Sequence, residues 1–418
     1  MNIKRYICLL LCLAMTLGLS ACKKINENFS SVSSDFSHTS SQQYQDVTIS
    51  ESKNEITSNN TSTSSTQSTT DEESNQTSTD LEKEYGFSSI KKVNYYCAKN
   101  TSEGDVVYAI ADIITNTDID IADFTTQIIC DNNNIKIDDK IVYIPRNYYE
   151  SNNSLSLTAK HISGISYNFT IKFDESWNVI FEDNFDGTEI NTDVWNIWDF
   201  NDWQYFYSTD AMYLDGEGHL VNRVSMLESP DPIYGYTKKS GAITTKEKYT
   251  STFGYYEVRM IPHLTTGMWS AFWLVAGDMD DKNAIEDNSA VNGCEIDVVE
   301  SIYGTKIPSC AIHWDGYYND QTESFSGYTL IEPMPEVFDG NFHTFAVRWS
   351  NYEYVFLVDG KVTVIAYPEN IGICNQPAYL LVSSHFGDWG GGLVLNPGEY
   401  SDTVVDYVKV YQSSIDPK

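Results

Sequence analysis

Alternation of apolar and polar side chains, repeated from about residue 176 to residue 413, is the feature that most constrains the fold of this chain. In Gly254–Met260 the odd-numbered residues would share one face of a strand and the even-numbered residues the other. Asp359-Gly360 separates the runs Tyr354–Val358 and Lys361–Ile365, and this dipeptide is typical of a two-residue hairpin. Because such runs follow one another without helical periods, we predict an all-β fold, an antiparallel sandwich of about 235 residues.

A second group of short β-type runs, separated by turn residues, lies between residues 85 and 175. The runs are Asp105–Ile114, Phe124–Cys130, Lys140–Ile144, Ser154–Ala159 and Tyr167–Phe173. Roughly five to seven strands in this length predict a small accessory β-sandwich, for which an immunoglobulin-like arrangement is one option. The segment shows no chemical constellation, so it either binds carbohydrate or spaces the next domain.

The first 21 residues have the pattern of an export signal, with Lys4 and Arg5 before the apolar run Tyr6–Leu19. The run ends in Leu19-Ser-Ala-Cys22, which resembles the lipobox of bacterial lipoproteins, where the cysteine becomes the lipidated first residue. We therefore expect an exported protein anchored through Cys22 to the outer face of the cell membrane. The alternative is an ordinary secretory signal and a secreted protein.

Residues 22–84 are dominated by Ser, Thr, Asn, Gln and acidic side chains. Such a segment cannot bury enough apolar surface to offset the entropy of ordering, so we predict a disordered tether. A binding role for it is the alternative.

The formal net charge of −33 argues against nucleic acid or an anionic membrane surface as a partner, and favours a neutral one. Five cysteines follow Cys22, and none of them forms a CxxC motif. A disulfide between Cys97 and Cys130 is an option in an exported protein.

Three carboxylates fall within Gly293–Glu300, separated by apolar residues. Glu295 and Asp297 would share one face of a strand, whereas Glu300 would face the other way unless a β-bulge at Val298-Val299 returned it. Paired carboxylates beside aromatic side chains are what glycosidic bond hydrolysis requires. A third acid can raise a neighbour's pKa and hold a proton there. The alternative is a surface strand with solvated acids.

The segment from about Val179 to Tyr411 resembles glycoside hydrolase family 16, the laminarinase-like β-glucanases. The matching pieces stand in the family's order, and they are Phe181–Gly187, Ser240–Thr244, Phe253–Arg259, Gly267–Leu274, Glu295–Glu300, Ile312–Trp314, Phe342–Phe345, Val358–Gly360 and Val405–Tyr411. The resemblance implies a β-jelly roll whose concave face forms a glycan groove.

The resemblance also implies a retaining double displacement, with Glu295 as nucleophile, Glu300 as acid/base and Asp297 as the assisting acid. The extra Val matches the bulged motif of laminarinase-like members, which argues for internal cleavage of β-1,3-glucan or mixed β-1,3/1,4-glucan. Some galactan-active members share the bulge, and xyloglucan-active members are usually one residue shorter.

Other positions carry over from the family as expectations. Substrate-binding roles are expected for Trp269, Trp273, Glu257, Arg259, His313 and Trp389. The alternatives are sandwich core for the two strand tryptophans, a solvated pair for Glu257 and Arg259, and a structural role for His313. Where the family usually has an asparagine that contacts sugar, this chain has Ala211, which leaves the exact glycan open.

We expect no cofactor for catalysis, but the family's structural calcium is expected to bind the Asp406 carboxylate and the carbonyls of Asp183 and Gly218. An ordinary acidic strand end is the alternative. The resulting prediction is a monomeric, membrane-anchored enzyme that hydrolyses β-glucan outside the cell. A glycan-binding lipoprotein with the same fold, or an enzyme for another β-glycan such as a galactan or xyloglucan, is the alternative.

Overall fold

The computed structural model describes residues 89–116, 126–161, 163–202, 205–303, 307–318, 323–328, 336–366, 372–387, 390–392 and 394–416. They belong to one compact unit, Ser78–Lys418. Among them, no helix has the length and apolar character needed to cross a membrane. The signal peptide, Cys22 and the tether lie outside the described residues, so these remain predictions.

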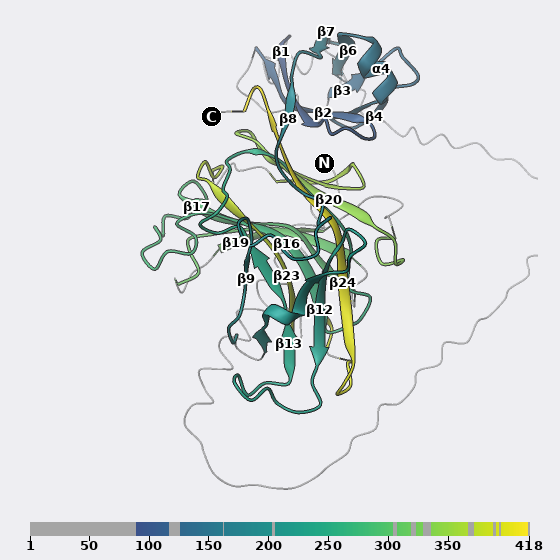
Figure 1. Cartoon of the computed structure of the whole chain (residues 1–418). Helices are drawn as coiled ribbons and strands as arrows, with labels where there is room; N and C mark the ends of the chain where they lie inside the picture. Colours follow the sequence, from purple (N-terminus) through teal and green to yellow (C-terminus); the bar gives the residue numbers. More distant parts are fainter. Residues whose placement is uncertain are drawn as a thin grey trace, which may run out of the picture. The chain divides into compact units, whose positions relative to one another are not determined.

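The first seven strands form a small sandwich of two sheets (Figure 1). One sheet has the order β1-β2-β5-β4, from Ile90–Lys99, Val106–Thr115, Ile141–Ile144 and Lys136–Asp138. The other has the order β3-β6-β7, from Thr126–Ile129, Ser154–His161 and Ser166–Lys172. If the strands are lettered A to G along the chain, the sheets are ABED and CFG, the arrangement of an immunoglobulin constant domain. The small sandwich thus adopts the immunoglobulin-like arrangement, which was one of the options left open by the sequence.

Each of the five predicted runs in this region overlaps an observed strand, whereas β1, β4 and the helix α4 (Arg146–Ser151) were not predicted. The helix has only six residues and follows Pro145, so its apolar period is too short to recognise. Within the described part of the chain, the cysteines form no disulfide. Cys97 lies on β1 and Cys130 directly follows β3 of the other sheet, and the structure does not form the optional disulfide.

Two larger sheets follow. The ten-stranded sheet has the order β10-β13-β12-β24-β15-β20-β21-β22, with β11 on β12 and β8 on β24. Its strands are β8 (Trp177–Asp183), β10 (Phe206–Tyr207), β11 (Met212–Leu214), β12 (Leu220–Met226), β13 (Lys238–Ser240), β15 (Gly254–Ile261), β20 (His343–Trp349), β21 (Tyr354–Val358), β22 (Lys361–Ala366) and β24 (Tyr400–Ser413).

The seven-stranded sheet has the order β19-β18-β17-β16-β23-β14-β9. Its strands are β9 (Asn196–Ile197), β14 (Ala242–Thr244), β16 (Met268–Gly277), β17 (Gly293–Ile302), β18 (Ile307–Trp314), β19 (Glu323–Tyr328) and β23 (Ala378–Phe386). A short 3-10 helix, η1, spans Thr209–Ala211. The described part of the chain is therefore all-β, with a jelly-roll sandwich after a smaller one, as predicted.

Alternation along the strands builds the core between these two sheets. On β15 the even-numbered residues Tyr256, Val258 and Met260 are fully buried there. They pack in one cluster with residues of the facing sheet, among them Phe272 and Ile296. The hairpin between β21 and β22 also forms as predicted, because Asp359 and Gly360 have φ angles of 48° and 72°, the positive values that a type I′ turn requires.

The outer face of the ten-stranded sheet packs against the small sandwich. One apolar cluster combines Tyr96 and Val107 of the small sandwich with Tyr255, Leu357 and Tyr411 of the sheet. Tyr255 alternates with the core residues of β15, which explains why it faces outward from the larger sandwich. The small sandwich and the jelly roll thus share buried apolar surface.

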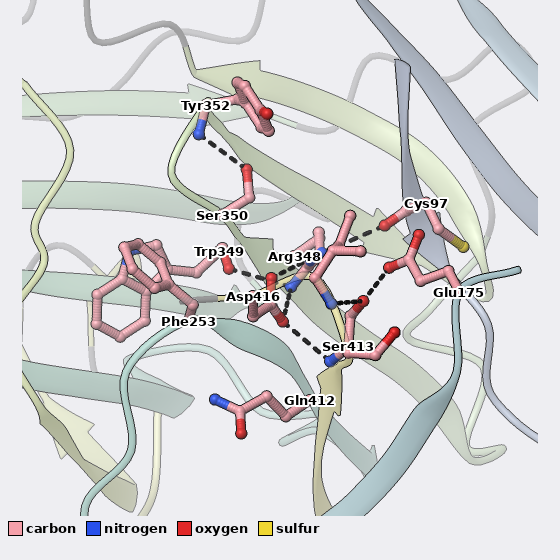
Figure 2. Close-up of polar contacts among 12 residues, drawn as sticks. Cys97, Glu175, Phe253, Arg348, Trp349, Ser350, Tyr352, Gln412, Ser413 and Asp416 are labelled. Atoms are coloured by element: carbon pink, nitrogen blue, oxygen red, sulfur yellow. Dashed lines mark hydrogen bonds and ion pairs between the residues drawn. The ribbon is translucent and has the colours of Figure 1, made fainter. Parts of the chain in front are cut away.

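A buried ion pair reinforces this contact (Figure 2). The Arg348 guanidinium donates to both oxygens of Asp416, at 2.6 and 2.9 Å, and its Nε donates to the carbonyl of Cys97 at 3.3 Å. Arg348 and Asp416 are only 1% and 3% exposed as side chains. Nearby, the Ser413 hydroxyl donates to Glu175. Arg348 therefore connects a strand of the large sheet, the C-terminal segment and β1.

We predict that Arg348→Met lowers the free energy of unfolding by about 3–5 kcal/mol, because it leaves the Asp416 carboxylate buried without its cation. Urea denaturation measures this loss. Arg223→Met is the control, since the Arg223–Asp402 pair is partly exposed and its removal should cost about 1 kcal/mol or less. Equal losses in the two variants would contradict the prediction.

Candidate active site

The predicted β-bulge is present on β17. Opposite β18, Asp297 pairs with Ala311 and Glu300 with Ser309, so three steps along β17 match two along its partner. On the β16 side, the register shifts between the same two acids. The extra residue turns Glu300 back to the face that carries Glu295 and Asp297. We call this outer face of the seven-stranded sheet the acid face.

The other side of β17 belongs to the core. Ile296, Val298 and Val299 are at most 4% exposed and lie in the cluster between the two large sheets. The strand therefore separates an apolar face from a carboxylate face, and the bulge accommodates two consecutive valines on the apolar side.

Hydrogen-bonding side chains from the neighbouring strand and loop contact the acids. Nε2 of His313, on β18, lies 3.2 Å from Oδ2 of Asp297 and 3.7 Å from Oε1 of Glu295. The hydroxyl of Tyr317, just beyond β18, donates to Oε2 of Glu295. The structure therefore brings the predicted His313 to the acids, and it adds Tyr317.

Burial raises the pKa values of all three acids, and the charges of neighbouring acids add to the rise for Glu295 and Glu300. Burial and then the charge of Asp297 raise the pKa of Glu295 to about 8, against the opposing effects of His313 and Tyr317. Burial raises the pKa of Asp297 to about 8. Burial, Asp297 and Glu295 raise the pKa of Glu300 well above its usual range. The cluster therefore retains protons at neutral pH. A group that protonates a leaving oxygen must itself be protonated at the pH of the reaction.

We predict that Asp297→Asn stabilises the folded protein at pH 8, by at least about 1 kcal/mol. The folded-state pKa of Asp297 is raised from 3.8 to about 8, so between these pH values the folded protein binds more protons than the unfolded chain. Wild-type stability from this group is present at low pH and falls as pH rises through that window. Asparagine does not titrate, so the variant's advantage should vanish near pH 4.

Urea denaturation from pH 4 to pH 8 measures this difference. Asp193→Asn, at an exposed position, is the control and should follow the wild type. A constant difference between Asp297→Asn and the wild type across the pH range would contradict the assignment.

Trp269 and Trp273 lie half-buried on the acid face of β16, so the structure does not place them in the core between the sheets. The side chain of Trp269 hydrogen-bonds to Glu300 and opposes the rise in that acid's pKa. The indole N–H of Trp273 donates to the Ser383 hydroxyl on β23 at 2.9 Å. Both rings therefore lie on the same face as the acids, and their binding of substrate remains a prediction.

The prediction that Glu257 and Arg259 contact substrate is wrong. Both lie on the outer face of β15, in the ten-stranded sheet, whereas the acids belong to the seven-stranded sheet. Glu257 is buried, and the hydroxyls of Tyr255 and Tyr407 donate to it at 3.0 and 2.9 Å. Alternation correctly grouped the side chains by face, but it does not say which sheet a strand joins.

The predicted calcium residues approach one edge of β24. Leu220 of β12 pairs with Val405 and Asp183 of β8 pairs with Val408, so Asp406 lies between the first residue of β12 and the last residue of β8 along that edge. Gly218 comes two residues before Leu220. The three residues therefore lie along the same stretch of β24.

Side-chain oxygens at this edge already have partners. The Asp406 carboxylate forms an ion pair with Arg259. The Asp183 carboxylate accepts the backbone N–H of Phe185 at 2.9 Å and the indole N–H of Trp195 at 2.8 Å. A calcium ion would rely on backbone carbonyls and compete with Arg259 for the Asp406 carboxylate, so the calcium site remains a prediction.

A second arrangement could hold a divalent ion. Ligand atoms of Glu295, Asp297 and His313 lie within 4.8 Å of one another. A cation there would occupy the carboxylates that glycoside hydrolysis requires. Trp389, the remaining predicted binding residue, lies outside the described residues.

Four further residues on or beside the acid face were not predicted from the sequence. They are Tyr205, Tyr207, Ser383 and His385, which form hydrogen bonds to one another. Some 180 residues separate Tyr205 from His385, and no motif joins them. Only the pairing of β23 with β16 brings His385 next to Trp269.

The region of the chain that carries these residues matches a known protein family. Residues 200–408 match the glycosyl hydrolases family 16. The chain belongs to this family. It is 27% identical over 267 residues to the glucan endo-1,3-beta-glucosidase A1 of Niallia circulans, with 56% of this chain and 38% of that protein covered. It is 30% identical over 183 residues to the endo-1,3-1,4-beta-glycanase EglC of Rhizobium meliloti (strain 1021), with 44% and 35% covered.

The family 16 chain thus spans well under half the length of these curated relatives. Among solved structures it is similar to the endo-beta-1,3-glucanase of Pyrococcus furiosus, with a TM-score of 0.49 and 22% identity. That comparison covers 58% of this chain and 96% of the other.

Proposed function

We propose that this chain is an endo-acting glycoside hydrolase that cleaves β-1,3-glucan or mixed β-1,3/1,4-glucan with retention of configuration. The observation that carries the proposal is the bulge on β17, which puts three carboxylates on one face among donors and aromatic rings. Membership of family 16 supports the same reaction class.

The surroundings of each acid suit a different role. Glu295 would act as the nucleophile, because His313 and Tyr317 face its carboxylate and stabilise the charged form. Glu300 would protonate the leaving oxygen, because burial and its two acidic neighbours favour its protonated form. After the glycosyl-enzyme forms, the Glu300 carboxylate would take a proton from the attacking water.

Asp297 lies between these two acids along β17 and is only 4% exposed. Its charge acts on both neighbours, and its own carboxyl group lies 3.2 Å from His313. It would hold a proton while Glu295 is charged and would release it as the charge on Glu295 is lost to the sugar.

The relatives' names and the bulge support the substrate class. Two of the curated relatives are a glucan endo-1,3-beta-glucosidase and an endo-1,3-1,4-beta-glycanase. The net charge of −33 favours a neutral polysaccharide over an anionic one. Trp269 and Trp273 would offer flat apolar surfaces to the sugar rings.

We predict that Glu295→Ala and Glu300→Gln each lower turnover of laminarin by at least about a hundredfold, as expected for the loss of a nucleophile or an acid/base group. Release of reducing sugar measures this, and thermal unfolding checks that each variant is folded. Glu257→Gln is the matched control and should retain activity, because Glu257 lies on the other large sheet. Activity near the wild-type level in either catalytic variant would refute the role assignment.

The same assay separates the alternatives. A panel of laminarin, lichenan, xyloglucan and agarose, analysed for products, shows which linkage is cut and whether cleavage is internal. A glycan-binding protein with the same fold would retain polysaccharide and release no reducing sugar from any of the four.

We also predict that the first product has the β-configuration of the bond that is cut, because a double displacement inverts the anomeric centre twice. Proton NMR recorded in the first minutes of hydrolysis distinguishes the β-anomer from the α-anomer before mutarotation mixes them. Initial formation of the α-anomer would exclude Glu295 as a nucleophile and indicate direct attack by water.

A further inference from the structure

His385 lies beside Trp269 on the acid face. The two residues are paired across β23 and β16, and their rings stack with centroids 5.4 Å apart and planes inclined by 18°. The imidazole therefore covers one face of the indole. The proposed mechanism leaves His385 without a role.

Hydrogen bonds hold the imidazole on both sides. Its Nδ1 lies 3.1 Å from the hydroxyls of both Tyr205 and Tyr207, and its Nε2 lies 2.8 Å from the Ser383 hydroxyl. The two tyrosines are buried and lie 2.9 Å apart through their hydroxyls. The ring cannot turn without breaking at least one of these contacts.

The imidazole is neutral at neutral pH. Burial lowers the pKa of His385 to about 4, against a smaller opposing effect of Asp202. A neutral imidazole has one donor and one acceptor nitrogen, and both are used here. Because both ring nitrogens are hydrogen-bonded and the ring stays neutral, His385 is a rigid support. It differs in this from a group that titrates during catalysis.

Trp269 is held at two further points. A Cβ atom at Gly387 would lie 3.2 Å from Cη2 and 3.3 Å from Cζ3 of the indole, so a glycine leaves room for the edge of this ring. The side chain of Trp269 also hydrogen-bonds to Glu300. The indole is thus fixed by His385 on one face, by Gly387 at its edge and by Glu300 at its donor.

This hydrogen bond affects the acid directly. An indole N–H can only donate, so it favours the charged form of Glu300. It lowers the pKa of Glu300, as His313 does, whereas burial and the charges of Asp297 and Glu295 raise it. A displaced indole would leave Glu300 protonated to a higher pH.

We propose that His385 is a positioning residue that holds the Trp269 indole so that its N–H donates to Glu300. The proposal rests on the proposed function, in which Glu300 is the acid/base. His385 acts through Trp269, and it needs no contact with substrate. The tyrosines and Ser383 act one step further away, by orienting the imidazole.

The test is the pH profile of kcat and of kcat/KM for His385→Ala and His385→Phe. In the alanine variant kcat should fall about tenfold or more, and the alkaline limb should move up by about one pH unit, the effect of losing a hydrogen bond to a charged group. Phenylalanine keeps a flat ring against Trp269, so it should restore part of both effects.

A double-mutant comparison shows whether the effect passes through Trp269. Trp269→Phe should move the alkaline limb in the same direction, and adding His385→Ala should move it no further. His219→Ala is the matched control, because His219 also stacks on an aromatic ring, Phe342, at 5.2 Å and 25°. An unmoved alkaline limb in His385→Ala, or additive shifts in the double variant, would overturn the proposal.

NMR of the indole N–H groups tests the same contact without turnover. The Trp269 signal, identified by its absence in Trp269→Phe, should follow the titration of Glu300, and its midpoint should rise in His385→Ala. An unchanged midpoint overturns the positioning role. If the midpoint rises but the wild-type protein cleaves no glycan, the proposed function fails while the positioning role stands.

Discussion

The opposite demands on the two faces of β17 are the constraint on which the site depends. One face must be apolar, because it closes the core between the large sheets, and the other carries three carboxylates. In a regular strand Glu300 would point into that core, where an unpaired carboxylate costs several kcal/mol. The bulge removes this conflict, and it lets Val298 and Val299 both pack inward.

Placing three acids together creates a second demand, which neighbouring elements meet. Repulsion and burial raise the pKa values, and donors on β16, on β18 and just beyond β18 oppose the rise. These donors are Trp269, His313 and Tyr317. The same crowding that destabilises the charged protein near neutral pH keeps a proton where the proposed reaction uses it.

The two large sheets use their outer faces differently. The seven-stranded sheet presents the acids, whereas the ten-stranded sheet packs against the small sandwich through Tyr255, Leu357 and Tyr411. Glu257 belongs to this second face, so the substrate contact expected for it from the family resemblance does not form. Sequence spacing gave the face correctly, and only sheet pairing shows where that face lies.

The sequence by itself determined the all-β class, the Asp359-Gly360 hairpin and the bulged run of acids, because each depends on neighbours along the chain. Predicted residues near the acids, Trp269 and His313, also came from local motifs. Tertiary structure alone decided the positions of Glu257 and Arg259 and the contact of His385 with Trp269. These positions and this contact depend on which strands pair. Strand pairing is set by the burial of the apolar surface of the whole domain, and no local sequence pattern contains that information.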